Sequence, residues 1–168
     1  MPDRAAAAGG AVILLDFDGC VSPDVWTPEA MPVSWPDWTP VDPHTFVSPL
    51  MLAALDALPA TIATASSRGS DMAHLVGPFL RGAPLVACPD GFKLDELDTF
   101  VNVHRPSRIV WIDDDLAWNG PNSRRVLQRR PGFLLAPAPL EGITPADVAT
   151  IGVWLADDNA PDVCVDRR

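Results

Sequence analysis

The stretch VILLDFDG, residues 12–19, decides the fold of this chain. Its first four residues form a continuous apolar run, which is typical of a strand buried on both faces in a parallel sheet. The run ends in two aspartates and a glycine. Ligands of parallel α/β sheets bind at the carboxyl ends of the strands, so this loop is a candidate for the functional site.

Four further apolar runs are typical of strands, and segments with helical spacing lie between them. The predicted strands are 61–64, 84–88, 108–112 and 133–135. The predicted helices are 49–58, 70–80, 94–103, 122–130 and 145–155. Ser48 and Thr144 are N-cap residues, and Asp147 is placed for a capping box. Strands that alternate with helices predict an α/β domain with a mainly parallel five-stranded sheet.

The length of 168 residues fits a single domain, with a core at about 11–156 and a loose tail at 157–168. The net charge of −10 disfavours duplex DNA binding, which depends on basic side chains that neutralise phosphates. No apolar run reaches the roughly 18 residues that a membrane span needs. The apolar run at 5–15 lacks the cleavage site of a signal peptide.

The three cysteines are widely spaced and form no CxxC pair, which argues against a disulfide scaffold or a zinc site. Such cysteine usage suits a reducing compartment, and we expect a cytoplasmic protein. The cations are informative as well. Lys93 is the only lysine among 12 basic residues, so its compact point charge is a candidate for a role that arginine does not fill.

Polar side chains follow the predicted strands at the points where these strands end. Carboxylates gathered at one sheet edge repel each other, and a hard cation relieves the repulsion. All-oxygen ligands favour Mg²⁺ over zinc, and a lysine and a hydroxyl beside the metal suit a phosphoryl group. The residues in question are Asp16, Asp18, Thr64, Lys93, Asp113 and Asp114.

These residues resemble the motifs of the haloacid dehalogenase-like (HAD) superfamily. Residues 16–19 match its DxDG first motif, Thr64 the second, Lys93 the third and the acid pair at 113–114 the fourth, all in the superfamily's order. Over 12–155 the chain is similar to the HAD domain found in Swiss Army Knife RNA repair proteins. The stretches that carry this closer resemblance are 62–65, 75–80, 92–94, 111–114 and 142–144.

The resemblance implies a HAD-like Rossmannoid three-layer sandwich and a magnesium-dependent phosphatase. Asp16 would be the nucleophile that forms an aspartyl-phosphate, and Asp18 the general acid and base. Thr64 and Lys93, helped by the Ala65 amide, would hold the phosphoryl oxygens. The metal ligands that the resemblance implies are Asp16, the Asp18 carbonyl and Asp114, with Asp113 orienting the shell around the ion.

The segments between the motifs leave no room for a cap domain, so we expect an open site with a small flap at about 20–47. An open site favours a nucleotide or a polynucleotide end as substrate, with a small phosphorylated metabolite as the alternative. A non-catalytic domain that accepts or binds a phosphoryl group is a further alternative. Tryptophans at 26, 35 and 38 could stack on a base or form a small satellite core, and we favour the core.

Overall fold

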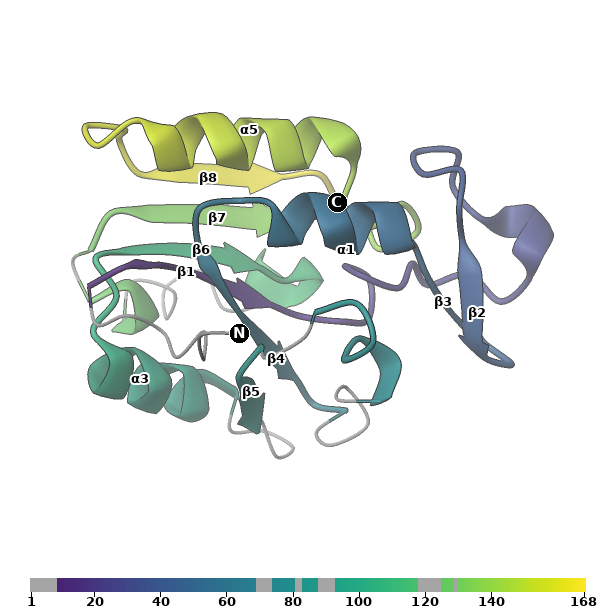
Figure 1. Ribbon diagram of the computed structural model, residues 1–168, viewed down its shortest axis with the longest axis horizontal. Helices are drawn as coiled ribbons and strands as arrows, with labels where there is room; N and C mark the ends of the chain where they lie inside the picture. Colours follow the sequence, from purple (N-terminus) through teal and green to yellow (C-terminus); the bar gives the residue numbers. More distant parts are fainter. Residues whose placement is uncertain (1–8, 69–73, 81–82, 88–92, 118–124, 129) are drawn as a thin grey trace.

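The structure is a computed structural model, and it describes residues 9–68, 74–80, 83–87, 93–117, 125–128 and 130–168. A six-stranded sheet forms its centre, with the strand order β5-β4-β1-β6-β7-β8 and parallel pairing throughout (Figure 1). The strands are β1 (Ala11–Leu15), β4 (Thr61–Ser66), β5 (Leu85–Ala87), β6 (Arg108–Ile112), β7 (Gly132–Ala136) and β8 (Val163–Asp166).

The five predicted strands are all present, which confirms the α/β class and the parallel sheet. The sixth strand, β8, lies in the segment that the sequence analysis assigns to a loose tail, and that assignment is wrong. β8 pairs with β7, and the Arg167 backbone N–H donates to the Ala136 carbonyl oxygen at 3.0 Å directly after it. The backbone of this segment is therefore part of the sheet.

Helices cover both faces of the sheet, so that the domain has three layers. α1 (Pro49–Asp56) and α5 (Pro145–Ala156) lie on one face, and α3 (Lys93–His104) lies on the other (Figure 1). β1 is buried from both sides. Its Ile13 and Leu15 pack in the core with α1 and α5, whereas Val12 and Leu14 pack in the core with α3. This alternation explains why every position of the strand is apolar.

The helix caps follow the prediction. The Met51 N–H donates to the Ser48 hydroxyl at 3.1 Å at the start of α1. Thr144 and Asp147 form a capping box at the start of α5. Of the helix predicted at 70–80, the described residues 74–80 are helical only at 74–75 and form turns at 76–79. Of the helix predicted at 122–130, residues 125–127 are helical, and 122–124 and 129 lie outside the described residues. Within the described part of the chain, no helix is long and apolar enough to cross a membrane.

The segment between β1 and α1 holds a short 3₁₀ turn, η1 (Pro28–Ala30), and an antiparallel hairpin of β2 (Thr39–Asp42) and β3 (Thr45–Val47). Figure 1 shows this hairpin at the right, beyond the carboxyl ends of the parallel strands. Trp35 is buried and donates to the Ile143 carbonyl at 2.7 Å, and Trp38 donates to the Pro32 carbonyl at 2.8 Å. Trp35 belongs to the core between the sheet and the helices α1 and α5, and Trp38 packs against that core. The separate satellite core that the sequence analysis favours is therefore not what these two residues form, and Trp26 is 74% exposed.

Candidate active site

The loop after β1 fixes the position of Asp16. The Asp16 N–H donates to the Ile112 carbonyl of β6 at 3.0 Å, so the residue stands at the very end of the sheet. The Phe17 N–H donates to Asp16 Oδ1 at 2.8 Å. The Phe17 carbonyl then accepts three backbone N–H groups, from residues 20, 21 and 22, which folds the loop into a tight turn. The backbone thus orients one oxygen of the carboxylate.

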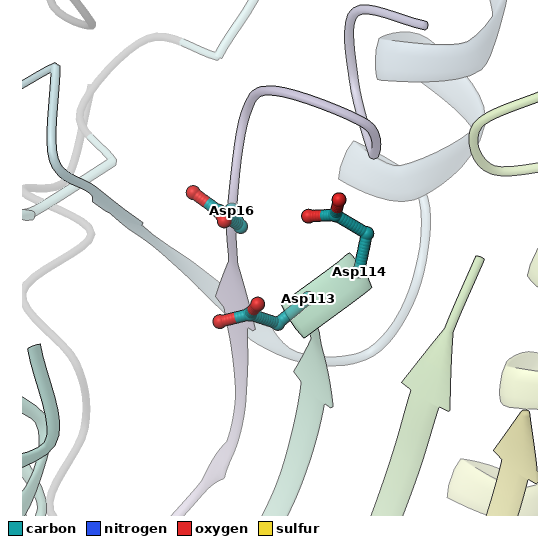
Figure 2. Close-up of side chains that lie close together, drawn as sticks. All are labelled: Asp16, Asp113 and Asp114. Carbon is teal, nitrogen blue, oxygen red and sulfur yellow. The ribbon is translucent and has the colours of Figure 1, made fainter. Parts of the chain in front are cut away.

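Asp113 and Asp114 follow β6 and meet Asp16 at the same edge of the sheet. One carboxylate oxygen of each residue lies within 4.8 Å of the others. Figure 2 shows Asp16 at the end of β1, and Asp113 and Asp114 at the end of the neighbouring β6. Asp114 begins the 3₁₀ turn η2 (Asp114–Ala117). This grouping is the one that the strand-end rule anticipates.

Lys93, the first residue of α3, forms ion pairs with two of these carboxylates. Its Nζ lies 2.6 Å from Oδ2 of Asp16 and 2.6 Å from Oδ2 of Asp113. Burial by itself lowers the pKa of Lys93, but Asp113 and Asp16 outweigh it and hold the pKa above its usual range. Lys93 is therefore a fixed positive charge within the cluster.

Asp113 is fully buried, and its oxygens are engaged on every side. Oδ1 accepts from the Asp115 N–H at 2.9 Å, and Oδ2 accepts from the Trp111 indole at 3.2 Å in addition to Lys93. A carboxylate held by three donors stays in one orientation. Asp113 is thus held in a fixed place beside Asp16 and Lys93.

One lysine does not balance the three carboxylates. Burial raises the pKa of Asp16 to about 6, with a further rise from Asp113 that Lys93 opposes. Burial likewise raises the pKa of Asp114 to about 7, and Asp115, Asp16 and Asp113 add to it. A cation held between these oxygens would relieve both effects. The cluster of Asp16, Asp113 and Asp114 could therefore hold a metal ion.

Gly19 makes room for Asp114 in this cluster. Its φ is +66°, and a Cβ atom added there would lie 2.5 Å from Oδ2 of Asp114. Both the left-handed backbone and the close approach of the carboxylate favour glycine at this position. The glycine of the DFDG stretch thus has a structural reason.

Gly19→Ala is expected to weaken divalent-cation binding by at least about tenfold, because the new methyl group displaces the Asp114 carboxylate. The left-handed backbone adds a loss of stability of roughly 1–2 kcal/mol. Isothermal titration with Mg²⁺ and urea unfolding measure the two effects. Gly152→Ala adds a methyl group on α5 near Leu58 and is the control for binding. Unchanged affinity in Gly19→Ala would show that Asp114 does not bind the cation.

The remaining predicted residues are less tightly grouped. Thr64 lies inside β4, in register with Leu15, and its hydroxyl donates to the Pro84 carbonyl at 3.5 Å. Ala65 follows it and is buried. The Asp18 side chain turns toward Arg68 and is absent from the carboxylate group found among the described residues. The structure therefore brings together Asp16 and Lys93 with the acid pair, and leaves the other side chains with separate partners.

Arg68 is a site residue that the sequence analysis missed. Its Nε donates to Asp18 Oδ2 at 2.9 Å, and its Nη2 lies 2.8 Å from Asp18 Oδ1. Arg68 follows β4, so the rule that places function at strand ends could have found it. The motif resemblance points instead to Thr64, four positions earlier.

Comparisons with family models, curated proteins and solved structures found no match to this chain. The structure shows the α/β fold and the acidic cluster, whereas only the motif residues support the HAD resemblance.

Proposed function

We propose that this protein is a magnesium-dependent phosphatase that hydrolyses phosphomonoesters through an aspartyl-phosphate on Asp16. The observation that carries the proposal is the Asp16 carboxylate at a strand end, within 4.8 Å of two further acids and 2.6 Å from the ammonium of Lys93. A nucleophile beside a cation site and a fixed positive charge suits phosphoryl transfer, which depends on positioning and charge neutralisation.

In the first step an Asp16 carboxylate oxygen forms a bond to phosphorus, and the bond from phosphorus to the ester oxygen breaks. The leaving oxygen takes a proton, for which Asp18 is the proposed donor. In the second step the water oxygen forms a bond to phosphorus and gives a proton to Asp18, and the bond from phosphorus to the Asp16 oxygen breaks. This step releases inorganic phosphate and restores the Asp16 carboxylate. The Phe17 N–H and Lys93 hold the two oxygens of Asp16 and so fix the orientation of the proposed nucleophile.

Asp16, Asp113 and Asp114 supply oxygen ligands only, and such a donor set suits Mg²⁺ better than zinc. When bound, Mg²⁺ would neutralise charge on the phosphoryl oxygens. Lys93 supplies a second positive charge, 2.6 Å from Oδ2 of Asp16. Thr64 and the Ala65 amide are proposed to complete the phosphoryl contacts, as the resemblance implies.

The contact between Arg68 and Asp18 favours a second candidate, a domain that accepts a phosphoryl group without releasing it. Both oxygens of Asp18 contact Arg68, and Asp18 lies outside the group of three carboxylates, so no proton donor is grouped with the nucleophile among the described residues. Incubation with acetyl phosphate and Mg²⁺, followed by mass spectrometry of the intact protein, separates the two candidates. A long-lived phosphorylated Asp16 supports the second, and steady release of phosphate supports the first.

Activity is tested with a panel of phosphomonoesters that spans nitrophenyl phosphate, sugar phosphates, nucleotides and oligonucleotides with terminal phosphates. Turnover in Mg²⁺ and its loss in a chelator are the expected results. The substrate class, whether nucleotide, polynucleotide end or small metabolite, is decided by kcat/KM across the panel. A preference of about 100-fold for a small sugar phosphate would overturn the open-site expectation.

Mg²⁺ is expected to stabilise the folded protein, and to do so more at about pH 8 than at about pH 5. The pKa values of about 6 for Asp16 and about 7 for Asp114 lie above the usual 3.8. The metal-free protein therefore gains stability as the pH falls through these values, and protons compete with the cation. At 100 times its Kd the ion adds about 2.7 kcal/mol. Calorimetric melts at both pH values, with and without Mg²⁺, measure the difference; equal shifts would contradict this prediction.

Lys93→Arg is expected to lower kcat by roughly 100-fold with little change in Tm. The variant keeps a positive charge between Asp16 and Asp113, but the wide guanidinium does not fit the place of one Nζ atom that lies 2.6 Å from both carboxylates. Arg125→Lys, at an exposed pair with Asp95, is the matched control. Turnover near the parent value would show that only the charge at position 93 matters.

A further inference from the structure

Arg68 lies between the loop after β1, which carries Asp16 and Asp18, and the β2–β3 hairpin. On one side its guanidinium holds both oxygens of Asp18, at 2.8 and 2.9 Å. On the other side its Nη1 donates to the Thr45 hydroxyl at 3.4 Å and lies 3.9 Å from Asp42 Oδ2. Its Cζ atom also lies 5.2 Å from the centroid of the Phe17 ring. One side chain therefore contacts the loop after β1 and both strands of the hairpin.

The chemistry of this position suits arginine and no other cation. A planar guanidinium offers two donors to one carboxylate and still has a third nitrogen for a separate acceptor, whereas an ammonium is a single point charge. The side chains of Arg68 and Asp18 are 34% and 45% exposed, so the charge attraction alone is weak in water. The bidentate geometry and the shared hairpin contacts are what give the contact a fixed direction.

β3 is buried and its Val47 lies in the core, so this strand anchors the hairpin, and Arg68 adds contacts to Thr45 and Asp42 near the turn. β2 has exposed and half-buried residues only, and β2 and β3 form a two-stranded sheet of their own. An isolated two-stranded hairpin is marginally stable in water. A second link joins it to the loop, since the Phe46 N–H donates to the Ser22 hydroxyl at 3.4 Å. Arg68 links the hairpin to Asp18, a carboxylate of the proposed catalytic set.

We infer that Arg68 is a positioning residue that couples the β2–β3 hairpin to Asp18, and so sets both the direction of the Asp18 carboxylate and the place of the hairpin at the mouth of the site. The catalytic part of this inference rests on the proposed phosphatase function. The coupling itself does not, because it can be measured without turnover.

Hydrogen exchange of the hairpin amides, residues 39–47, tests the coupling. Arg68→Met is expected to raise exchange there by roughly tenfold, and Asp18→Ala to do the same although Asp18 is outside the hairpin. The double variant is expected to exchange no faster than either single variant, since both remove the same link. Arg125→Met, which breaks an ion pair on α3, is the control that leaves the hairpin unchanged. Unchanged exchange in Arg68→Met, or additive effects in the double variant, would overturn the inference.

Activity supplies a second, separate readout. Arg68→Met is expected to lower kcat on nitrophenyl phosphate by roughly 10- to 100-fold with KM nearly unchanged, and added guanidinium chloride is expected to restore part of the loss. Arg68→Lys is expected to behave like Arg68→Met. A rise in KM alone would make Arg68 a substrate ligand and overturn the positioning role, and so would parent-like behaviour of Arg68→Lys.

The two readouts separate the inference from the proposed function. If the parent protein releases no phosphate, the phosphatase proposal fails, and the exchange experiment still decides the coupling. If Arg68→Met does not fold, Thr45→Val removes the hairpin end of the link with little change in shape. That variant is expected to raise hairpin exchange as well, and a parent-like result would overturn the coupling.

Discussion

Asp16→Asn is expected to abolish phosphate release, by at least roughly 1,000-fold, while the protein stays folded. An amide does not form the covalent bond to phosphorus that the proposed mechanism requires. The fold should tolerate the change, because burial already raises the pKa of Asp16 and a neutral side chain costs less to bury. The Asn oxygen can still accept from the Phe17 N–H or from Lys93. Phosphate release and the thermal melt of the same preparation measure both effects.

Asp98→Asn is the matched control for Asp16→Asn. Asp98 is a carboxylate on α3 that accepts from Arg125 at 3.3 Å and from Gln128 at 2.7 Å, away from the acidic cluster. This variant is expected to keep the parent turnover. Residual turnover of Asp16→Asn at the parent rate would show that Asp16 is not the nucleophile, whereas loss in both variants would point to a general effect of charge.

Removal of residues 157–168 is expected to lower the free energy of unfolding by roughly 3–5 kcal/mol. The deletion removes β8 and leaves β7 as an unpaired edge. It also removes the acceptor of the Trp154 indole, the Pro161 carbonyl at 2.8 Å, and the carboxylate that holds the Gly132 N–H, Asp162 at 2.9 Å. Urea unfolding of the full and shortened chains measures the loss. Equal midpoints would mean that the segment is the loose tail that its sequence suggests.

Single substitutions of Arg167 and Arg168 test which contacts of the deleted segment account for the loss of stability. Arg167 donates to Glu141 at 3.0 Å, to the Gly142 carbonyl at 2.9 Å and to Asp147 of the capping box at 2.7 Å. Arg168 pairs with Asp166, two residues before it on the same strand end. Arg167→Met is therefore expected to account for a measurable share of the loss, and Arg168→Met for little. A larger effect of Arg168→Met would contradict this assignment of the C-terminal contacts.

β1, β6 and β7 were predictable because each holds an unbroken apolar run, and a strand buried on both faces allows little else. β8 was not, because only residues 163–165 are apolar and the segment is flanked by Asp162 and Asp166. Its burial alternates between half-buried and exposed, as expected for an edge strand. β8 is held by partners that are distant in the sequence, above all β7 and the contact from Arg167 to Asp147 of α5. A local sequence pattern does not predict such contacts.

The acidic cluster was predictable for a related reason. Asp16 and Asp113 follow adjacent parallel strands, so the topology alone brings them together, and α3 begins at Lys93. Arg68 also follows a strand next to β1, so the strand-end rule predicts its place at this edge of the sheet but not that its partner is Asp18. The contact to Arg68 joins residues 50 positions apart and depends on the path of the chain after β4, which no motif in the sequence encodes.

The direction of β8 has a practical consequence for protein engineering. Because β8 runs parallel to β1 and β6, it ends at the same edge of the sheet as Asp16 and Asp113. Arg168, just past this strand, is near enough to Asp114 and Asp115 for their charges to raise its pKa, after the larger effect of Asp166. An affinity tag or a fused fluorescent protein attached after Arg168 would emerge beside the acidic cluster, and a polyhistidine tag there would bring metal-binding imidazoles next to it. β1 begins at the opposite edge, so a tag placed before residue 11 enters the sheet away from the cluster and is the better choice for metal-binding assays.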